Sequence, residues 1–146
     1  MNVAIGSDHR GLSQRQFVTQ AVIAAGHVPI DCGTFSFESV DYPDIAADVA
    51  NRVASGSADR GVLLCGTGIG VSIAANKING IRAAVCWDDD SVRLSRQHND
   101  ANILCLSSER FSETDYLRLL KLWLETPFEG GRHAKRTAKI QGLERK

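Results

Sequence analysis

The sequence lacks an excess of charge of either sign. Seventeen Lys and Arg residues balance seventeen Asp and Glu residues, so the molecule as a whole is not drawn toward nucleic acid or an anionic membrane. No stretch is long and apolar enough to cross a bilayer. The N-terminus enters a strand-like segment at once and has no signal-peptide pattern. We therefore expect a cytoplasmic protein without a nucleic-acid or membrane partner.

The cysteines lack the spacing of a redox or metal-binding pair. Cys32, Cys65, Cys86 and Cys105 form no CxxC motif, and no set of His, Cys and carboxylate residues has convincing metal-ligand spacing. Cys86 and Cys105 lie in apolar runs, where free cysteines usually act as small core residues. Zinc-ribbon and thioredoxin-like proteins are therefore disfavoured, and no metal is expected.

What the chain does have is a regular alternation of strand-like and helix-like segments within 146 residues, enough for one domain over 1–146 that needs no disulfide to fold. The expected strands are 3–5, 28–30, 62–65, 81–86 and 103–106. The expected helices are 14–25, 43–54, 71–76, 89–97, 114–125 and 132–143. This order predicts an α/β fold, a Rossmann-like three-layer sandwich around a five-stranded parallel sheet. The last helix follows a Pro/Gly hinge at 126–131, and we expect it to reach toward a partner subunit.

The most informative segment is VLLCGTGIGVSIAANK at 62–77, which predicts a buried strand, a glycine-dense turn and a helix. Cys65 stands where the strand becomes the turn. Gly66, Gly68 and Gly70 lack a Cβ, so the backbone can bend tightly and approach a ligand. The amides of the turn run into a helix N-terminus, which favours anions. A nucleophile or base beside an anion hole is a catalytic arrangement, and we favour it over a simple tight turn.

Further polar clusters lie next to the other expected strands, at 6–11, 31–33, 41–44 and 97–100. Because ligands of open α/β sheets bind outside the carboxyl ends of the strands, convergence of these clusters on one edge would build one pocket. Each cluster also has a structural interpretation. Asp8 is a candidate helix cap and Asp44 a helix-start charge, His9 and His98 are candidate surface histidines, and Tyr42 is a candidate packing residue.

Two arginines near the C-terminus form a candidate phosphate site. Arg132 and Arg136 are four residues apart and share a helical face. Two guanidinium groups on one face suit a phosphate dianion. The alternative is a solvated basic helix, the commoner meaning of such a run.

Several other motifs are absent. Val71 stands where a tyrosine-phosphatase loop requires arginine and where a dinucleotide-binding motif requires glycine or alanine. There is no GxxxxGK sequence, which excludes a P-loop. A hydrolase that pairs Cys65 with His98 stays open at this point.

Five separate segments together resemble the ribose-5-phosphate isomerase type B family, which includes relatives acting on allose 6-phosphate and galactose 6-phosphate. They are GSDHRG at 6–11, DYPD at 41–44, CGTGIGVSIAANKINGIRA at 65–83, SRQHNDANILCL at 95–106 and EGGRHAKR at 129–136. The resemblance implies interconversion of ribose 5-phosphate and ribulose 5-phosphate through a cis-enediolate, without metal or organic cofactor. A six-carbon substrate and a non-catalytic phosphosugar-binding module are the alternatives.

The resemblance also implies a role for each matching residue. Cys65 would be the base, with Thr67 assisting proton movement between the substrate oxygens. His98 would open the sugar ring beside Asp8 and Tyr42. The amides of Gly66, Gly68, Ile69 and Gly70 would hold the enediolate, Asn99 the sugar hydroxyls, and His9, Arg110, Arg132 and Arg136 the phosphate.

One branch of the family uses a glutamate in the loop instead of this cysteine, at the position of Val71 here, so the chain matches the cysteine-using branch. The family pools residues from two subunits. It therefore implies a homodimer, with a tetramer as the alternative, in which His98 and the C-terminal arginines meet Cys65 across the interface.

Overall fold

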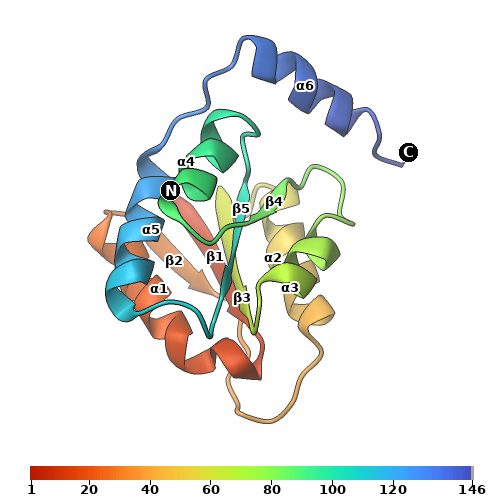
Figure 1. The fold of residues 1–146 in the computed structure, drawn as a ribbon. Coiled ribbons are helices and arrows are strands. Elements are labelled where there is room, and N and C mark those ends of the chain that lie inside the picture. The colour runs from red at the N-terminus through yellow and green to blue at the C-terminus, as the bar shows by residue number, and fades with distance from the viewer. Residues whose placement is uncertain (146) are drawn as a thin grey trace.

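The five strands form one fully parallel sheet in the computed structural model, which describes residues 1–145 (Figure 1). They are β1 (Asn2–Ser7), β2 (Val28–Asp31), β3 (Arg60–Cys65), β4 (Ala83–Val85) and β5 (Ile103–Ser107), in the spatial order β2-β1-β3-β5-β4. All five expected strands are present, and the predicted parallel sheet is confirmed.

Helices cover both faces of the sheet, which confirms the predicted three-layer sandwich. They are α1 (Leu12–Ala24), α2 (Tyr42–Ala54), α3 (Ile69–Ala75), α4 (Asp89–Gln97), α5 (Glu113–Glu125) and α6 (Arg132–Gln141). Helices α1, α4 and α5 pack on one face, and α2 and α3 pack on the other. A 3-10 turn, η1 (His9–Gly11), precedes α1 and was not expected from the sequence.

The central strands are apolar on both faces because both faces are covered. Along β3, Val62 and Leu64 point into the layer of α1, α4 and α5, whereas Leu63 and Cys65 point into the layer of α2 and α3. The first layer is filled by the aromatic side chains of α5, of which Trp123 is completely buried. Cys86 and Cys105 are buried core residues, as predicted.

Helix α6 stands clear of the sandwich at the top of Figure 1. His133 is its only buried residue. None of the helices within residues 1–145 is long and apolar enough to span a membrane.

The strand order reverses between β1 and β3, which lie side by side. The chain leaves β1 toward α1 on one face of the sheet and leaves β3 toward α3 on the other. Such a switch point opens a crevice outside the carboxyl ends of the two strands, where α/β proteins bind their ligands.

Candidate active site

Cys65 is the last residue of β3 and therefore lies at this switch point. Its side chain is only 5% exposed and packs in the same apolar layer as Val71 and Ala75 of α3. The Sγ atom accepts a hydrogen bond of 3.2 Å from the backbone N–H of Gly68. The sulfur thus sits at the boundary between the apolar layer and the glycine turn that follows it.

Burial keeps the other three cysteines protonated. It raises the pKa of Cys86 to about 11 and that of half-buried Cys32 to about 11, and it raises the pKa of Cys105 well above the ordinary range. All four cysteines are free. Among them, Cys65 is the one next to a turn of backbone donors.

The glycine turn is shaped by close neighbours as well as by its own conformation. Gly68 has φ +80°, a left-handed conformation that favours glycine, and a Cβ there would lie 3.1 Å from the carbonyl carbon of Leu106. The turn is tied to the end of β5, because the hydroxyl of Ser107 donates to the carbonyl of Gly66 at 2.6 Å. Thr67 is exposed, and its Oγ1 accepts the N–H of Ile69 at 3.1 Å.

Side chains from two other segments, η1 and the start of α2, lie directly on the turn. A Cβ on Gly66 would come within 2.5 Å of the guanidinium of Arg10, and a Cβ on Gly70 within 2.7 Å of the Tyr42 ring. The turn after β1 and the start of α2 therefore close over the glycine turn. Glycine is needed here to admit neighbouring side chains as much as to bend the backbone.

The polar residues after β1 belong to the same site. Asp8 is buried and accepts hydrogen bonds from the backbone N–H groups of Arg10 and Gly11, so its predicted capping role is confirmed, on η1. The Nδ1 atom of His9 accepts the N–H of Val40 at 3.3 Å, which assigns the ring proton to Nε2.

Asp44 lies in the first turn of α2, as predicted.

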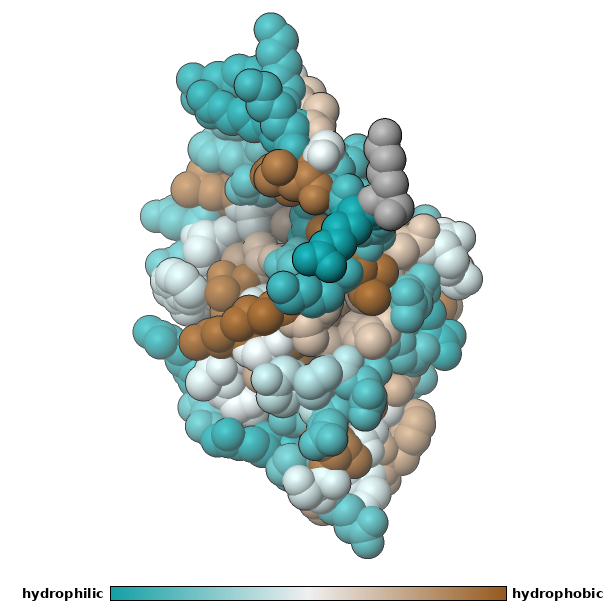
Figure 2. All heavy atoms as spheres, turned by 90° about the vertical axis from the view of Figure 1, so that its right-hand side faces the viewer, coloured by the Kyte–Doolittle hydropathy of each residue, from teal (hydrophilic) through white to brown (hydrophobic). Residues whose placement is uncertain are grey.

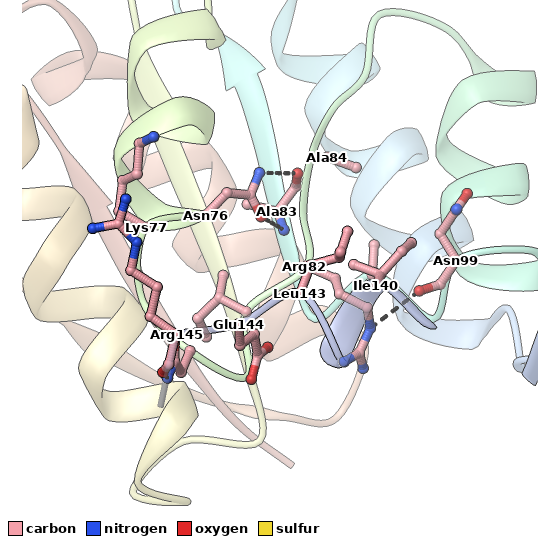
Figure 3. A pocket seen from close by; sticks show the side chains of 13 residues that line it. Asn76, Lys77, Arg82, Ala83, Ala84, Asn99, Ile140, Leu143, Glu144 and Arg145 are labelled. Carbon is pink, nitrogen blue, oxygen red and sulfur yellow. Dashed lines mark hydrogen bonds between the residues drawn. The ribbon is translucent and has the colours of Figure 1, made fainter. Parts of the chain in front are cut away.

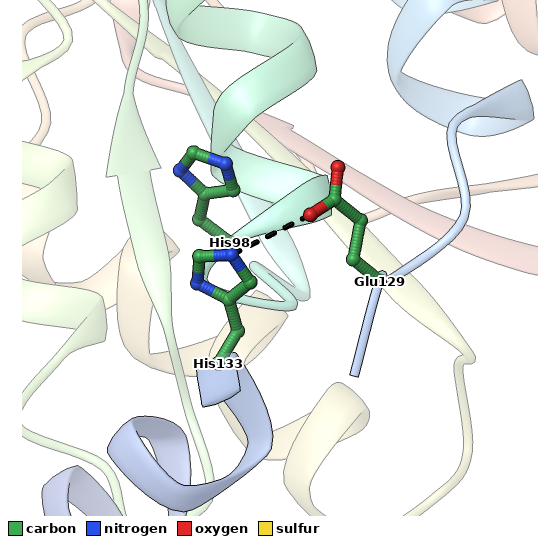
Figure 4. A group of neighbouring side chains, drawn as sticks. All are labelled: His98, Glu129 and His133. Carbon is green, nitrogen blue, oxygen red and sulfur yellow. Dashed lines mark ion pairs between the residues drawn. The ribbon is translucent and has the colours of Figure 1, made fainter. Parts of the chain in front are cut away.

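His98 lies at the opposite end of the sheet. It follows the last residue of α4, a helix that runs back toward the amino ends of the strands. Its ring stacks on His133 of α6, with 4.2 Å between the ring centroids and 9° between the planes (Figure 4). Arg132 and Arg136 are exposed on the same helix, so the ring-opening and phosphate-binding candidates are held near each other.

The predicted convergence of all the polar clusters on one edge is therefore wrong within a single chain. Asp8, His9, Tyr42, residues 65–70 and Arg110 lie at the carboxyl edge, whereas His98, Asn99, Arg132 and Arg136 lie at the amino edge. The five residues of β5 separate the two edges by roughly 13 Å. The polar segment 97–100 precedes β5 and therefore lies at the amino edge of the sheet. The clusters that follow their strands lie at the carboxyl edge.

The stacked imidazoles also lie near a carboxylate. Ligand atoms of His98, Glu129 and His133 lie within 4.8 Å of one another. Imidazole lone pairs lie in the ring plane, so two nearly parallel rings direct them side by side and not toward one ion. Burial, His98 and Arg132 lower the pKa of His133, which favours a neutral ring. The group is better suited to joining α4 to α6 than to holding a metal.

A cavity of about 800 Å³ lies beside the C-terminal segment (Figure 3), and Cys65 is not among the residues that line it. Its lining includes Asn99, Arg82 and Ile140. The segment after α6 closes it through two hydrogen bonds of 2.7 Å, from Asn79 to the carbonyl of Arg145 and from the N–H of Gly80 to Glu144. On the sheet side, the amide of Asn76 bonds both the N–H and the carbonyl of Ala83 and so covers the edge of β4.

Fold and site together define an α/β protein with a cysteine and a glycine-rich turn at the switch point of its sheet, the position at which proteins of this architecture bind their ligands. Residues 3–140 match the ribose/galactose isomerase family. The chain is 43% identical to ribose-5-phosphate isomerase B of Escherichia coli over 144 residues, 99% of this chain and 97% of that protein.

Solved structures agree with this match. The ribose-5-phosphate isomerase B of Clostridium thermocellum is 48% identical, with a TM-score of 0.95 over 98% of this chain and 97% of that one. The Mycoplasma genitalium enzyme, solved with bound ribulose 5-phosphate, is 39% identical, with a TM-score of 0.92 over 97% and 94%. The chain belongs to the ribose/galactose isomerase family, and the resemblance drawn from its motifs is confirmed.

Two side chains at the carboxyl edge were not predicted from the sequence. Arg10 lies within the motif at 6–11, but an arginine on a polar turn gives no signal of its own. Glu109, which pairs with Arg10, lies outside every motif. Neither could be found without knowing that the loops after β1 and β5 meet over the glycine turn.

The two glycines should respond differently to alanine. We expect Gly68→Ala to lower the free energy of unfolding by about 1–2 kcal/mol, because the residue is left-handed and its Cβ meets backbone. Gly66→Ala should cost less, because its Cβ meets only the end of a flexible arginine. Urea denaturation of both variants measures the difference, and equal losses would contradict this description of the turn.

Proposed function

We propose that this protein is an aldose–ketose isomerase that interconverts ribose 5-phosphate and ribulose 5-phosphate. The observation that carries the proposal is the Cys65 sulfur against the amide of Gly68, at the switch point of a family member. The names of the similar proteins favour a five-carbon substrate.

In the proposed reaction the Cys65 thiolate removes the proton from C2 of the open-chain aldose, and the electron pair forms a cis-enediolate. Backbone N–H groups of Gly66, Gly68, Ile69 and Gly70 stabilise the charge that develops on its oxygens, which lowers the barrier selectively. Thr67 assists proton movement between O1 and O2, and return of the proton to C1 gives the ketose. His9 and Arg110 of the same chain, together with Arg132 and Arg136 of a second chain, hold the phosphate and thereby fix the reacting carbons.

The separation of Cys65 from His98 in one chain supports a site shared between two chains. His98 would open the furanose ring bound at the partner's Cys65 site, beside Asp8 and Tyr42, and Asn99 would bind sugar hydroxyls. Exposed apolar side chains on α3 and at the end of α6 offer a surface for a second copy. They are Ile69, Ile73, Ile140 and Leu143, and Figure 2 shows the side of the molecule on which these two elements lie, with brown side chains among hydrophilic ones.

The same separation weakens the hydrolase alternative, since a Cys–His pair needs hydrogen-bond distance within one site. This separation does not distinguish the proposed function from a six-carbon isomerase or a non-catalytic phosphosugar-binding module. Assays can distinguish these alternatives.

Substrate preference is tested by parallel assays with ribose 5-phosphate, allose 6-phosphate and galactose 6-phosphate. We expect the highest kcat/KM with ribose 5-phosphate. Faster turnover of a six-carbon sugar phosphate would move the proposal to that substrate. A rise in melting temperature with ribose 5-phosphate but no product would instead favour the binding module.

The base is tested by Cys65→Ala. Because proton transfer by a positioned side chain typically contributes 10²- to 10⁴-fold, we expect kcat to fall by roughly this factor. Titration calorimetry should show ribose 5-phosphate binding largely unchanged. Cys86→Ala, at a core cysteine in the opposite layer of the sheet from Cys65, is the control and should keep its turnover. Near-normal kcat in Cys65→Ala would reject the proposed base.

The shared site is tested by mixing two inactive variants, Cys65→Ala and His98→Asn. If each site takes Cys65 from one chain and His98 from the other, every mixed dimer regains one intact site. After unfolding and refolding of an equal mixture, we expect up to about a quarter of wild-type activity. Mixtures that stay as inactive as the separate variants would place both residues in one chain's site.

A further inference from the structure

Arg10 lays its guanidinium group over the residue that follows Cys65. A Cβ built on Gly66 would lie 2.5 Å from Nη1, 2.6 Å from Cζ and 3.0 Å from Nη2 of Arg10. The group therefore faces the Gly66 backbone broadly, next to the amides proposed to hold the enediolate.

The backbone at the root of this side chain is fixed, whereas its guanidinium group is half exposed. The backbone N–H of Arg10 donates to Asp8 at 3.0 Å. The neighbouring Gly11 is packed so tightly that a Cβ on it would lie 2.9 Å from the Cβ atoms of both Leu64 and Ser7. The Arg10 side chain itself is 51% exposed. Arg10 thus presents a half-exposed cation from a tightly packed turn.

Glu109 holds the tip of Arg10 through an ion pair with Nη2. The backbone N–H of Glu109 donates to the Ser107 hydroxyl at 3.1 Å, and that hydroxyl donates to the carbonyl of Gly66 at 2.6 Å. The carboxylate is thus attached to the same turn that Arg10 covers. Because both side chains are about half exposed, the ion pair adds little to stability, and an incoming anion can replace the carboxylate easily.

We propose that Arg10 leaves Glu109 to stabilise the negative charge that develops on the enediolate oxygens over Gly66. The inference rests on the proposed isomerase function and adds a full positive charge to the backbone donors of the turn. The hydrogen bond from a charged donor becomes stronger as negative charge develops on the acceptor oxygen. Arg10 therefore stabilises the enediolate intermediate more than the sugar before the proton is removed. Glu109 keeps Arg10 over the turn between substrates and competes with the enediolate for it.

The two partners of the pair should therefore have opposite effects. We expect Arg10→Gln to lower kcat at least about tenfold with little change in KM, and Arg10→Lys to recover part of the loss. Glu109→Gln removes the competitor and should leave kcat/KM equal or higher. Steady-state assays with ribose 5-phosphate, with melting temperatures of all variants, measure this.

Three outcomes would overturn the inference. Wild-type activity in Arg10→Gln would exclude a role for the charge. Equal losses in Arg10→Gln and Glu109→Gln, with lowered melting temperatures, would make the pair structural. A raised KM with unchanged kcat in Arg10→Gln, together with weaker inhibition by inorganic phosphate, would assign Arg10 to the phosphate group.

A matched control is the ion pair between Arg52 and Asp48 on α2, whose side chains are 41% and 44% exposed. Arg52→Gln should change neither kcat nor KM. If the wild-type protein does not isomerise ribose 5-phosphate, the proposed function itself fails. If the wild-type protein does and Arg10→Gln matches it, only the present inference fails.

Discussion

The parallel pairing of β1 with β3 is the constraint on which the site depends. Its register sets Ser7 opposite Leu64, and the N–H of Asp8 extends the pairing by donating to the carbonyl of Leu64. After these strands, the two segments of the chain turn toward opposite faces of the sheet. The first residues after Ser7 and after Leu64 therefore lie next to each other, at the place where the segments separate. Two turns that are 57 residues apart in the sequence, counted from Ser7 to Leu64, thereby form one wall of the site. The turn after β2 joins them, because the N–H of Ser7 donates to the carbonyl of Gly33 and the carbonyl of Ser7 accepts the N–H of Thr34.

The layers of the fold were predictable because the buried strands are short apolar runs and the helices between them carry apolar residues on one face. Helices 89–97 and 114–125 were predicted to within one residue. In the structure, Asp88 and Ser112 each form a capping box at the start of these helices. Strand boundaries were less accurate. The apolar run 81–86 contains only three ladder residues, Ala83–Val85. Ile81 is buried by packing before the ladder begins, whereas the N–H of Cys86 still donates to the carbonyl of Cys105 in β5. Hydropathy alone does not separate these two causes of burial.

The site was predictable in its parts but not in its grouping. Residue types and glycine spacing marked Cys65, Asp8 and Tyr42, and the strand ends bring them together. The edge to which each cluster belongs depends on whether it precedes or follows its strand, and this separates His98 from the others. Close approaches such as Arg10 on Gly66 depend on the sheet register and on the path of each loop, so they are set by tertiary structure.

The position of α6 is set by a small number of tertiary contacts at its two ends. A helix of ten residues is shorter than the roughly 12–15 residues at which isolated helices become even marginally stable, so its ends must be fixed by tertiary contacts. The His98–His133 stack fixes one end, and the bonds from Asn79 and Gly80 to the segment after the helix fix the other. Both anchors lie at the amino edge of the sheet, where this chain's own glycine turn is out of reach. The arginines of α6 are consequently presented to solvent beside His98. In the proposed shared site, a second copy of the chain brings these three side chains to a Cys65.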